Sequence, residues 1–484
     1  MDVIRVFGRA VRRHGDQLFL FDPNTAVTYL EADARTDAVA ARLIGLGIAP
    51  GDTVGMASPD RVSLWLSIIG CWKAGALPAM IDARTPDDAL PYFVEDAGVN
   101  LVVAAPEIAD RIKRVGVPAV VDIEEITADS SAASVNLHGP ESPLFLSYTS
   151  GTTGDPKGVI LTSESVTLGA SCIAERLRLT REDVLLTTTP ISSSFQLVAA
   201  LMPALHTGSS VGLTAGSSTD VIWQVALDRQ ATILVAYPLT LADIAYSPIA
   251  DKATSPFRLA LSGGSSLAPR IKQEYKERLG IPLLESYGQS ELGGFMALGA
   301  PHDSKAALAA GYAGRSLPDR LAFVGDDDCI EVPAGELGEV MVTHGYFQDY
   351  RNKPEKVAAA TRGGVLHTGD IGLNDADGYL KVVGRLSEKV TAIERGGFLR
   401  DVEDSYYEHP SVQHAVAAES ASGIIEGFVE LRNSHQATAK QLQEHVAARV
   451  PASLVPRTTT VLAKMPRTFS GKADRLKLAA RIDD

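Results

Sequence analysis

The stretch YTSGTTGDPKGV, residues 148–159, joins two apolar runs and consists mainly of glycine, hydroxyl-bearing residues and one lysine, Lys157. Glycine lets backbone N–H groups approach an anion without a clash, while hydroxyls and lysine add donors and positive charge. The preceding PLFLSY and the following GVILT predict strands, so this stretch is expected to be the turn between two paired strands. Its composition indicates a loop that binds polyphosphate.

The neighbours of Lys157 distinguish this loop from the P-loop of nucleotide hydrolases. A P-loop needs glycine before its lysine and Ser or Thr after it, at the start of a helix. Here Pro156 precedes Lys157 and Gly158 follows it. This spacing argues against a P-loop NTPase, and the alternative to phosphate binding is a flexible polar hairpin.

The whole chain has 484 residues and a formal net charge of −14. Its length predicts roughly two to four domains or subdomains. Its acidity disfavours nucleic acid or an anionic membrane as the main partner. The apolar residues 64–81 contain Lys73 and Pro78, so they are interpreted as a buried helix running into a strand, and no membrane span is expected.

The three cysteines, Cys71, Cys172 and Cys329, are far apart in the sequence and lack the paired spacing of metal ligands. They predict neither a disulfide framework nor a zinc site. Free thiols are typical of a reducing compartment, so a cytoplasmic location is expected.

Apolar runs with helical and strand periodicity alternate through the first 300 residues. This alternation is typical of parallel sheets covered by helices, and it predicts an α/β fold with two layered α/β subdomains. From about residue 311, short runs with Gly and Asp turns predict a small β-rich subdomain. After Arg385 the pattern changes to that of a small α+β domain of about a hundred residues.

Six further motifs follow the loop: SGGSSL (262–267), YGQSE (287–291), GELGE (335–339), HTGD (367–370), GR (384–385) and PRTFSGKADR (466–475). Together with YTSGTTGDPKGV, this order resembles the acyl-adenylate-forming superfamily of acyl-CoA synthetases, adenylation domains of nonribosomal peptide synthetases and firefly-type luciferases. The resemblance implies a large N-terminal domain over residues 1–385, a hinge at 386–388 and a small mobile C-terminal domain over 389–484.

Acids are activated in this superfamily by converting a carboxyl oxygen, otherwise a poor leaving group, into a phosphate ester. Attack on the α-phosphorus of ATP gathers negative charge on the carboxylate, the α-phosphate and pyrophosphate, so cations and N–H donors must neutralise it. The resemblance assigns the pyrophosphate end of ATP to the residues Thr149, Ser150, Gly151, Thr152, Thr153, Gly154 and Lys157. It assigns Mg²⁺ to Glu291, since a hard cation prefers carboxylate oxygen, and the α-phosphate to the Ser290 hydroxyl.

The adenosine of ATP is assigned to other motifs by the same resemblance. Gly263 and Gly264 end the apolar run FRLAL and would let adenine lie against the backbone, with Tyr287 stacked on the ring. Asp370 would accept hydrogen bonds from both ribose hydroxyls, and Arg385 would act nearby as a fixed donor. Taken alone, paired glycines are also typical of a structural turn. Asp370 or Arg385, taken alone, would also be typical of a charged residue on a solvated loop.

Lys472 in PRTFSGKADR is implied to be the catalytic lysine that bridges the carboxylate and the α-phosphate. A lysine near a C-terminus is ordinarily a solubilising charge, but its position in the motif favours the catalytic role. Because Lys472 belongs to the small domain, that domain would have to close for activation and rotate away for the second half-reaction. The pivot is expected at Leu386, Ser387 and Glu388.

The loop after the hinge departs from the superfamily pattern. Glu394 stands where relatives usually have a glycine, Gly396 and Gly397 come slightly later, and Leu399 takes the place of a proline. In relatives this loop lines the tunnel for the acceptor thiol. The sequence therefore indicates acid activation more strongly than it indicates CoA as the acceptor.

The acyl pocket departs from the pattern as well. In TTTPISSSFQL, Ser192 and Ser193 replace an aromatic residue and a histidine, and leave room for a bulkier or more polar acid. Gly288 is assigned to the same pocket. No Asp lies between Pro190 and Gly208 to pair with a substrate ammonium, which disfavours an α-amino acid because an unpaired buried ammonium is costly.

These observations predict an ATP- and Mg²⁺-dependent, AMP-forming ligase that activates a small non-amino or aryl carboxylic acid. The acyl group is expected to pass to a pantetheine thiol, either of CoA or of an acyl carrier protein. The alternatives are transfer to an amine or another nitrogen nucleophile, an amino-acid-activating enzyme, and a non-catalytic nucleotide-binding homologue. Retention of Lys472, Glu291, Asp370 and Lys157 disfavours the last alternative.

Overall fold

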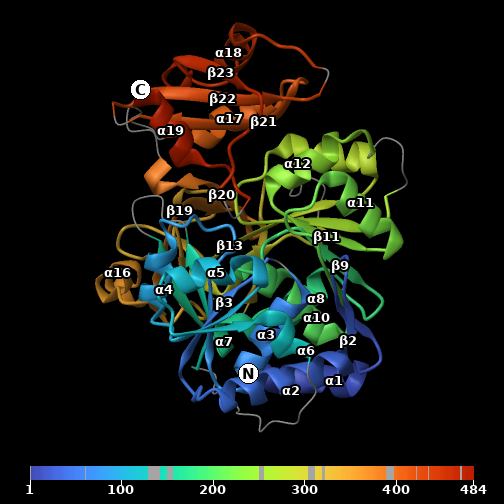
Figure 1. Ribbon diagram of the computed structural model, residues 1–484. Coiled ribbons are helices and arrows are strands. Elements are labelled where there is room, and N and C mark those ends of the chain that lie inside the picture. The colour runs from blue at the N-terminus through green and yellow to red at the C-terminus, as the bar shows by residue number, and fades with distance from the viewer. Residues whose placement is uncertain are drawn as a thin grey trace.

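The computed structural model describes residues 2–59, 61–128, 142–149, 156–249, 255–303, 311–318, 322–388, 397–420, 422–433, 435–468 and 471–483. Two α/β layers form a large N-terminal part, and a smaller C-terminal domain lies across one end of it (Figure 1). This arrangement confirms the predicted α/β class and the predicted order of a large and a small domain. The boundary at residues 386–388 stays a prediction.

The first sheet has seven strands within the described residues, in the order β18-β8-β7-β4-β3-β5-β6. Strands β3 to β7 pair in parallel, β8 pairs antiparallel with β7, and β18 pairs antiparallel with β8 at the edge of the sheet. Thr149 at the end of β7 lies opposite Lys157 at the start of β8, which confirms the predicted strand pair around the glycine-rich loop. The bounds are β3 (Thr53–Ala57), β4 (Leu77–Met80), β5 (Leu101–Ala104), β6 (Ala119–Asp122), β7 (Pro143–Thr149), β8 (Lys157–Thr162) and β18 (Asp349–Tyr350).

The second sheet follows the order β16-β17-β19-β20-β15-β14-β13-β12-β11-β9-β10-β1-β2. Strands β13, β12, β11, β9, β10 and β1 pair in parallel. The strands of the predicted β-rich subdomain continue this sheet, because β13 turns back into antiparallel β14, which pairs with β15. The N-terminal β1 also belongs here, since it pairs with β10.

Bounds in the second sheet fall into two groups. The parallel strands are β1 (Leu18–Phe21), β9 (Val184–Thr187), β10 (Ser210–Leu213), β11 (Ile233–Ala236), β12 (Leu259–Ser262) and β13 (Leu283–Gln289). The remaining strands are β2 (Ala26–Thr28), β14 (Gly294–Leu298), β15 (Gly314–Ser316), β16 (Ala322–Gly325), β17 (Gly338–Val342), β19 (Leu366–Asn374) and β20 (Tyr379–Arg385).

Helices cover both sheets. All residues of α3 are buried, as expected for a helix that is apolar on every side. The stretch SESVTLGASCIAERL forms two helices, α7 and α8, because Gly169 between them has φ +82°, which an α-helix cannot contain. The helices of the large domain are α1 (Val3–His14), α2 (Tyr29–Gly45), α3 (Val62–Lys73), α4 (Leu90–Ala97), α5 (Pro106–Arg114), α6 (Ile123–Ala128), α7 (Ser163–Thr167), α8 (Ala170–Arg176), α9 (Ser194–Gln196), α10 (Met202–Thr207), α11 (Thr219–Asp228), α12 (Pro238–Tyr246), α14 (Pro269–Glu274) and α16 (Pro354–Ala360).

Short helical turns extend or link these elements. Two π-helical turns, η1 (Leu197–Leu201) and η2 (Tyr275–Leu279), continue α9 and α14, and the 3-10 turns are η3 (Ser290–Leu292), η5 (Arg362–Gly364), η6 (Leu386–Glu388) and η7 (Ala452–Leu454).

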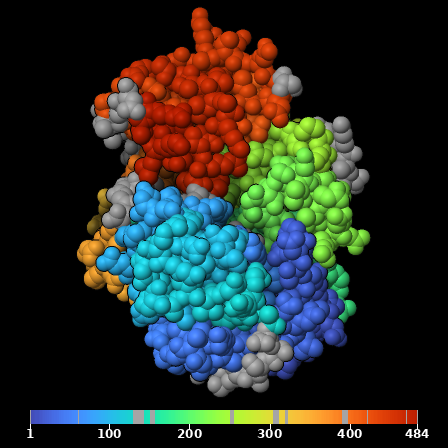
Figure 2. Space-filling model, viewed as in Figure 1, coloured from blue at the N-terminus to red at the C-terminus, as the bar shows by residue number. Residues whose placement is uncertain are grey.

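The C-terminal domain combines a small sheet with three helices in the described part of the chain. Its strands β21 (Val412–Glu419), β22 (Ile425–Leu431) and β23 (Thr458–Leu462) are accompanied by α17 (Leu399–Tyr407), α18 (Ala439–Ala447) and α19 (Arg475–Asp483). Helix α17 packs against α14 and β20, and β21 packs against α12. Figure 2 shows this domain seated across the end of the large domain.

The parallel strands β11, β12 and β13 end at the same edge of the second sheet. Residues within two positions of the ends of these strands, among them Tyr237, Gly264 and Ser290, are therefore brought together. Open α/β sheets bind ligands at such an edge. In the described part of the chain, we find no helix with both the length and the apolar character needed to cross a membrane.

Candidate active site

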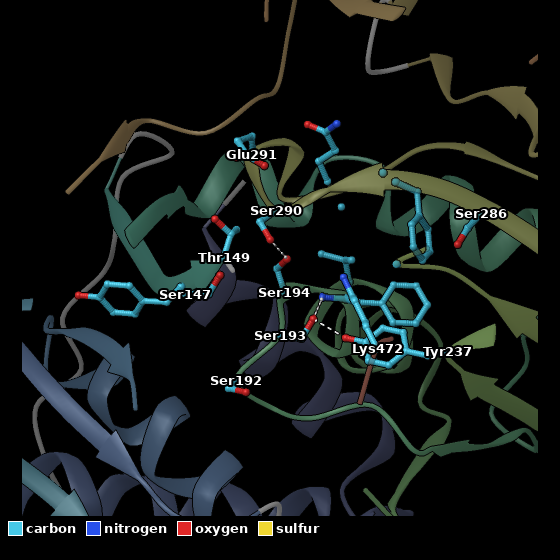
Figure 3. A pocket seen from close by; sticks show the side chains of 18 of the residues that line it. Ser147, Thr149, Ser192, Ser193, Ser194, Tyr237, Ser286, Ser290, Glu291 and Lys472 are labelled. Atoms are coloured by element: carbon cyan, nitrogen blue, oxygen red, sulfur yellow. Dashed lines mark hydrogen bonds between the residues drawn. The ribbon is translucent and has the colours of Figure 1, made fainter. Parts of the chain in front are cut away.

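A cavity of about 240 Å³ lies between the carboxyl ends of these strands and the C-terminal domain. Large-domain side chains line most of it, and Lys472 enters it from the C-terminal domain alongside Tyr237 (Figure 3). Its described lining residues are Ser147, Tyr148, Thr149, Lys157, Ser192, Ser193, Ser194, Phe195, Val198, Tyr237, Gly264, Ser286, Gly288, Gln289, Ser290, Glu291, Gly294, Phe295, Arg385 and Lys472.

The glycine-rich loop contributes its two ends to this cavity. Thr149 and Lys157 both line it, and the Lys157 Nζ lies 5.1 Å from the centre of the Tyr350 ring. The predicted phosphate ligands Ser150, Gly151, Thr152, Thr153 and Gly154 lie outside the described residues. Their assignment to pyrophosphate stays a prediction.

Ser290 and Glu291 lie side by side on the 3-10 turn η3, directly after β13. The Ser290 Oγ accepts a hydrogen bond from Ser194 Oγ at 3.4 Å, and the Glu291 Oε1 accepts one from the Tyr350 hydroxyl at 2.8 Å. Burial and the nearby Glu291 raise the pKa of Tyr350, so this hydroxyl stays a donor at neutral pH. The pair presents a hydroxyl and a carboxylate to the cavity.

Lys472 is held in the cavity by a tight turn. Gly471 before it has φ +91°, and the Thr468 N–H donates to the Lys472 carbonyl at 2.8 Å. The Lys472 Nζ lies 5.3 Å from the centre of the Tyr237 ring. Burial and then the charge of Arg385 lower the pKa of Lys472 to about 8, against an opposing effect of Glu291. Its ammonium is therefore destabilised until an anion arrives.

Asp370 is the centre of a hydrogen-bond network behind the residues that line the cavity. It is 4% exposed and accepts hydrogen bonds from the Tyr287 hydroxyl at 2.6 Å, Gln289 Nε2 at 2.7 Å and Arg385 Nε at 3.0 Å. Arg385 and Gln289 line the cavity, whereas Tyr287 directs its hydroxyl to the carboxylate. Burial raises the pKa of Tyr287, which keeps that hydroxyl a donor. The assignments to ribose and adenine stay predictions.

Three predicted glycines are explained by close packing. A Cβ on Gly263 would lie 2.3 Å from the Phe195 ring, and one on Gly288 would lie 2.3 Å from the Gly294 carbonyl oxygen. Gly264 has φ +79°, and its Cβ would lie 2.6 Å from the Tyr237 ring. Gly264 and Gly288 line the cavity directly, whereas Gly263 makes room for the aromatic side chain behind it.

Aromatic side chains and hydroxyls form the wall below Lys472. Phe195 stacks on Tyr237 with ring centres 5.8 Å apart and meets Phe295 edge-on at 5.4 Å. The Ser193 Oγ accepts hydrogen bonds from the Tyr237 hydroxyl at 3.0 Å and the Phe195 N–H at 3.3 Å, so its own proton can be donated to a ligand. This end of the cavity suits a flat apolar group with a polar substituent.

Ser192 points away from this wall (Figure 3) and donates to Asp82 Oδ2 at 2.6 Å. It also lines a second cavity of about 260 Å³, so the two cavities meet at this residue. Arg84, paired with Asp82 at 2.6 Å, and Arg111 line the second cavity beside apolar residues such as Ile108.

Several site residues were not found by sequence reasoning, above all Tyr237, Gln289 and Tyr350. Tyr237 had a usable signal, because it follows the apolar strand β11, adjacent to the strand that ends in SGG. Tyr350 had none, since it reaches Glu291 from a short strand 59 residues away. In the post-hinge loop, Glu394 and Gly396 lie outside the described residues, and Leu399 begins α17. Ser387 lies in the turn η6, and its hinge role stays a prediction.

The chain matches the AMP-binding enzyme family over residues 7–347 and the AMP-binding enzyme C-terminal domain over residues 401–472. It is 25% identical over 458 residues to a feruloyl-CoA synthase of Amycolatopsis sp, covering 93% of this chain and 92% of that protein. It is 29% identical over 467 residues to the oxalate–CoA ligase of Arabidopsis thaliana, covering 90% of each.

Among solved structures, an anthranilate CoA ligase in complex with anthranoyl-AMP has the same fold, with a TM-score of 0.92 at 23% identity, covering 100% of this chain and 97% of that one. The O-succinylbenzoate coenzyme A synthetase of Bacillus subtilis, solved with ATP and a magnesium ion, gives a TM-score of 0.85 at 23% identity, covering 98% of both chains. The chain therefore belongs to the AMP-binding enzyme family, and with it to the acyl-adenylate-forming superfamily that its motifs resemble.

Proposed function

We propose that this enzyme is an ATP-dependent, AMP-forming ligase that joins a small aryl or other non-amino carboxylic acid to the thiol of CoA. One observation carries the proposal: Lys472 of the C-terminal domain enters a cavity whose one end bears Lys157, Ser290 and Glu291 and whose other end is aromatic. The residues proposed to bind phosphate and the aromatic wall proposed to bind the acyl group therefore line one cavity together with the Lys472 ammonium.

In the first half-reaction a carboxylate oxygen attacks the α-phosphorus of ATP, the bond to the β-phosphate oxygen breaks, and acyl-AMP and pyrophosphate result. The positive charge of Lys472 would hold the carboxylate and the α-phosphate together while negative charge builds between them. Ser290 would donate to the α-phosphate and Lys157 would neutralise the leaving pyrophosphate. In the second half-reaction a thiolate attacks the acyl carbon and AMP leaves.

Mg²⁺ would be held by Glu291. Only one of its carboxylate oxygens has a donor among the described residues, the Tyr350 hydroxyl, so the other is available for a cation. Within the described part of the chain no cluster of three acidic, His or Cys side chains could hold a metal by itself. The ion would therefore share its coordination with phosphate oxygens and water, as Mg²⁺ commonly does, and supply charge neutralisation.

An aryl acid fits the acyl end because Phe195, Tyr237 and Phe295 surround it with ring faces and edges. Among the described lining residues Glu291 is the one carboxylate, and it lies at the proposed phosphate end, so an α-ammonium group at the acyl end would have no carboxylate partner. The names of relatives, feruloyl-CoA synthase and anthranilate CoA ligase, support the same class.

CoA is the proposed acceptor because the second cavity offers a route to the first. Ser192 lines both cavities, and the second is also lined by Arg84 and Arg111, which are paired with the carboxylates of Asp82 and Asp87. The two guanidinium groups would bind the phosphates of CoA by exchanging these carboxylates for phosphate oxygens. Transfer to an acyl carrier protein or an amine would be a different outcome of the same test. None of the cysteines Cys71, Cys172 and Cys329 forms a disulfide, which fits the proposed cytoplasmic location.

The test is acid-dependent pyrophosphate release with ATP and Mg²⁺ across a panel of aryl, aliphatic and amino acids, followed by product masses with CoA, a phosphopantetheinylated carrier protein or an amine. We expect release with aryl acids and an acyl-CoA product. Failure of every acid to release pyrophosphate would leave only nucleotide binding. Lys472→Ala is the control, since it should lose release while still binding ATP.

A further inference from the structure

Asp243 of the large domain joins the two domains at a point outside the cavity. It lies on α12, and its Oδ1 accepts hydrogen bonds from His414 Nε2 at 2.7 Å and Gln413 Nε2 at 2.8 Å. Its Oδ2 accepts one from Arg467 Nη2 at 2.6 Å. All three donors belong to the C-terminal domain, so one carboxylate gathers two segments of that domain onto α12.

The contact is largely shielded from water. His414 is fully buried, and Asp243 is about a quarter exposed, with 24% of its side chain accessible. Burial alone would raise the pKa of Asp243, but the hydrogen bond from His414 and the charges of His414 and Arg467 outweigh it and lower the pKa to about 2. The carboxylate is therefore ionised at neutral pH. Its hydrogen bonds are charge-assisted, and such hydrogen bonds are stronger than those between neutral groups.

Arg467 belongs to the same turn as Lys472. Arg467 and Ala473 pair as an antiparallel bridge, so the two sides of the turn are held together next to the lysine. Anchoring Arg467 thus anchors the backbone that carries Lys472.

The same helix also carries the surface on which Lys472 rests. Tyr237 directly precedes α12, and its ring lies 5.3 Å from Lys472 Nζ. Asp243 lies six residues further along, roughly 9 Å at the rise of an α-helix. Helix α12 therefore fixes the lysine turn at two points, with the aromatic ring at the amine and the carboxylate at the base of the turn.

We propose that Asp243 is a positioning residue for acid activation, which holds the Lys472 turn against the large domain. This inference rests on the proposed function. Asp243 does not line the cavity, so it acts through Arg467 and His414 and not on the substrate. Its removal should impair the half-reaction that uses Lys472 and spare thiol attack on preformed acyl-AMP.

The experiment compares wild type, Asp243→Ala and Asp243→Asn with Asp220→Ala, which removes an exposed carboxylate from α11 of the same domain. Pyrophosphate release measures activation, and thioester formation from synthetic acyl-AMP and CoA measures the second half-reaction. We expect Asp243→Ala to lower kcat for activation at least tenfold with thiolysis within twofold of wild type, and Asp220→Ala to change neither. Equal loss in both half-reactions, or in neither, would overturn the proposal.

A second measurement does not depend on catalysis. The rate at which an amine-acylating reagent labels Lys472, followed by peptide mass, reports whether the lysine turn is held in the cavity. We expect labelling to accelerate several-fold in Asp243→Ala, with an unchanged unfolding midpoint. An unchanged labelling rate would refute the positioning role, whether or not the wild type activates any acid. If the wild type releases no pyrophosphate with any acid, that result would count against the proposed function alone.

Discussion

Raising the pH is expected to switch off acid activation by removing the proton from Lys472. The pKa of this amine is lowered to about 8 from the usual 10.5 of lysine, first by burial and then by Arg385. Because the pKa is lowered, the charged form is present below pH 8 and is lost as the pH rises through it. With such a pKa, the ammonium makes up roughly 90% of the enzyme at pH 7 and roughly 10% at pH 9.

The kcat/KM for acid-dependent pyrophosphate release, which reports groups of the free enzyme, should therefore fall about tenfold between pH 7 and pH 9. At saturating ATP the fall in kcat should move to higher pH, since phosphate anions favour the ammonium form. Rates would be measured in steps of half a pH unit with constant ionic strength and Mg²⁺.

The control for this profile is Lys472→Arg, because a guanidinium keeps its charge through the whole range. Its activity is expected to be low but independent of pH above 7. A wild-type kcat/KM that stays level to pH 10, or an identical fall in Lys472→Arg, would refute the assignment of the titration to Lys472.

Three substitutions test other parts of the site. Gly264→Ala should destabilise the protein by more than the roughly 1–2 kcal/mol of left-handed backbone strain, because its Cβ would lie 2.6 Å from the Tyr237 ring, as measured by denaturant unfolding. Asp370→Asn should raise KM for ATP about 10- to 100-fold, since a charge-assisted hydrogen bond is worth about 1.5–3 kcal/mol. Arg84→Gln should raise KM for CoA several-fold and leave pyrophosphate release unchanged, as measured by the two half-reaction assays.

Each substitution has a matched comparison. Gly280→Ala carries the same backbone strain at φ +71° with no atom within 4 Å of the added Cβ, so it should cost less than Gly264→Ala. For Asp370→Asn, an unchanged KM for ATP would remove the ribose assignment. If Arg84→Gln slowed activation as strongly as thioester formation, the second cavity would not be the route of CoA.

The two ends of the glycine-rich loop, the Ser290–Glu291 pair and Lys472, which all line the cavity, could be predicted because each belongs to a short motif whose donors and charges are contiguous. The strand pair around the loop was likewise predictable, since β7 and β8 are neighbours in the sequence. The break between α7 and α8 could not be predicted, because apolar periodicity continues across Gly169 and only its φ of +82° shows that the chain leaves the helix there.

By itself the sequence determined the family, the layered α/β class and the chemistry that the motifs can perform, because these follow from local composition and periodicity. Only the tertiary structure decided which distant residues complete the site. Strand order places Tyr237 and Phe195 side by side at the aromatic end of the cavity, and domain packing brings Arg467 to Asp243, 224 residues away. Such partners depend on how sheets and domains pack together, and local sequence carries no trace of that arrangement.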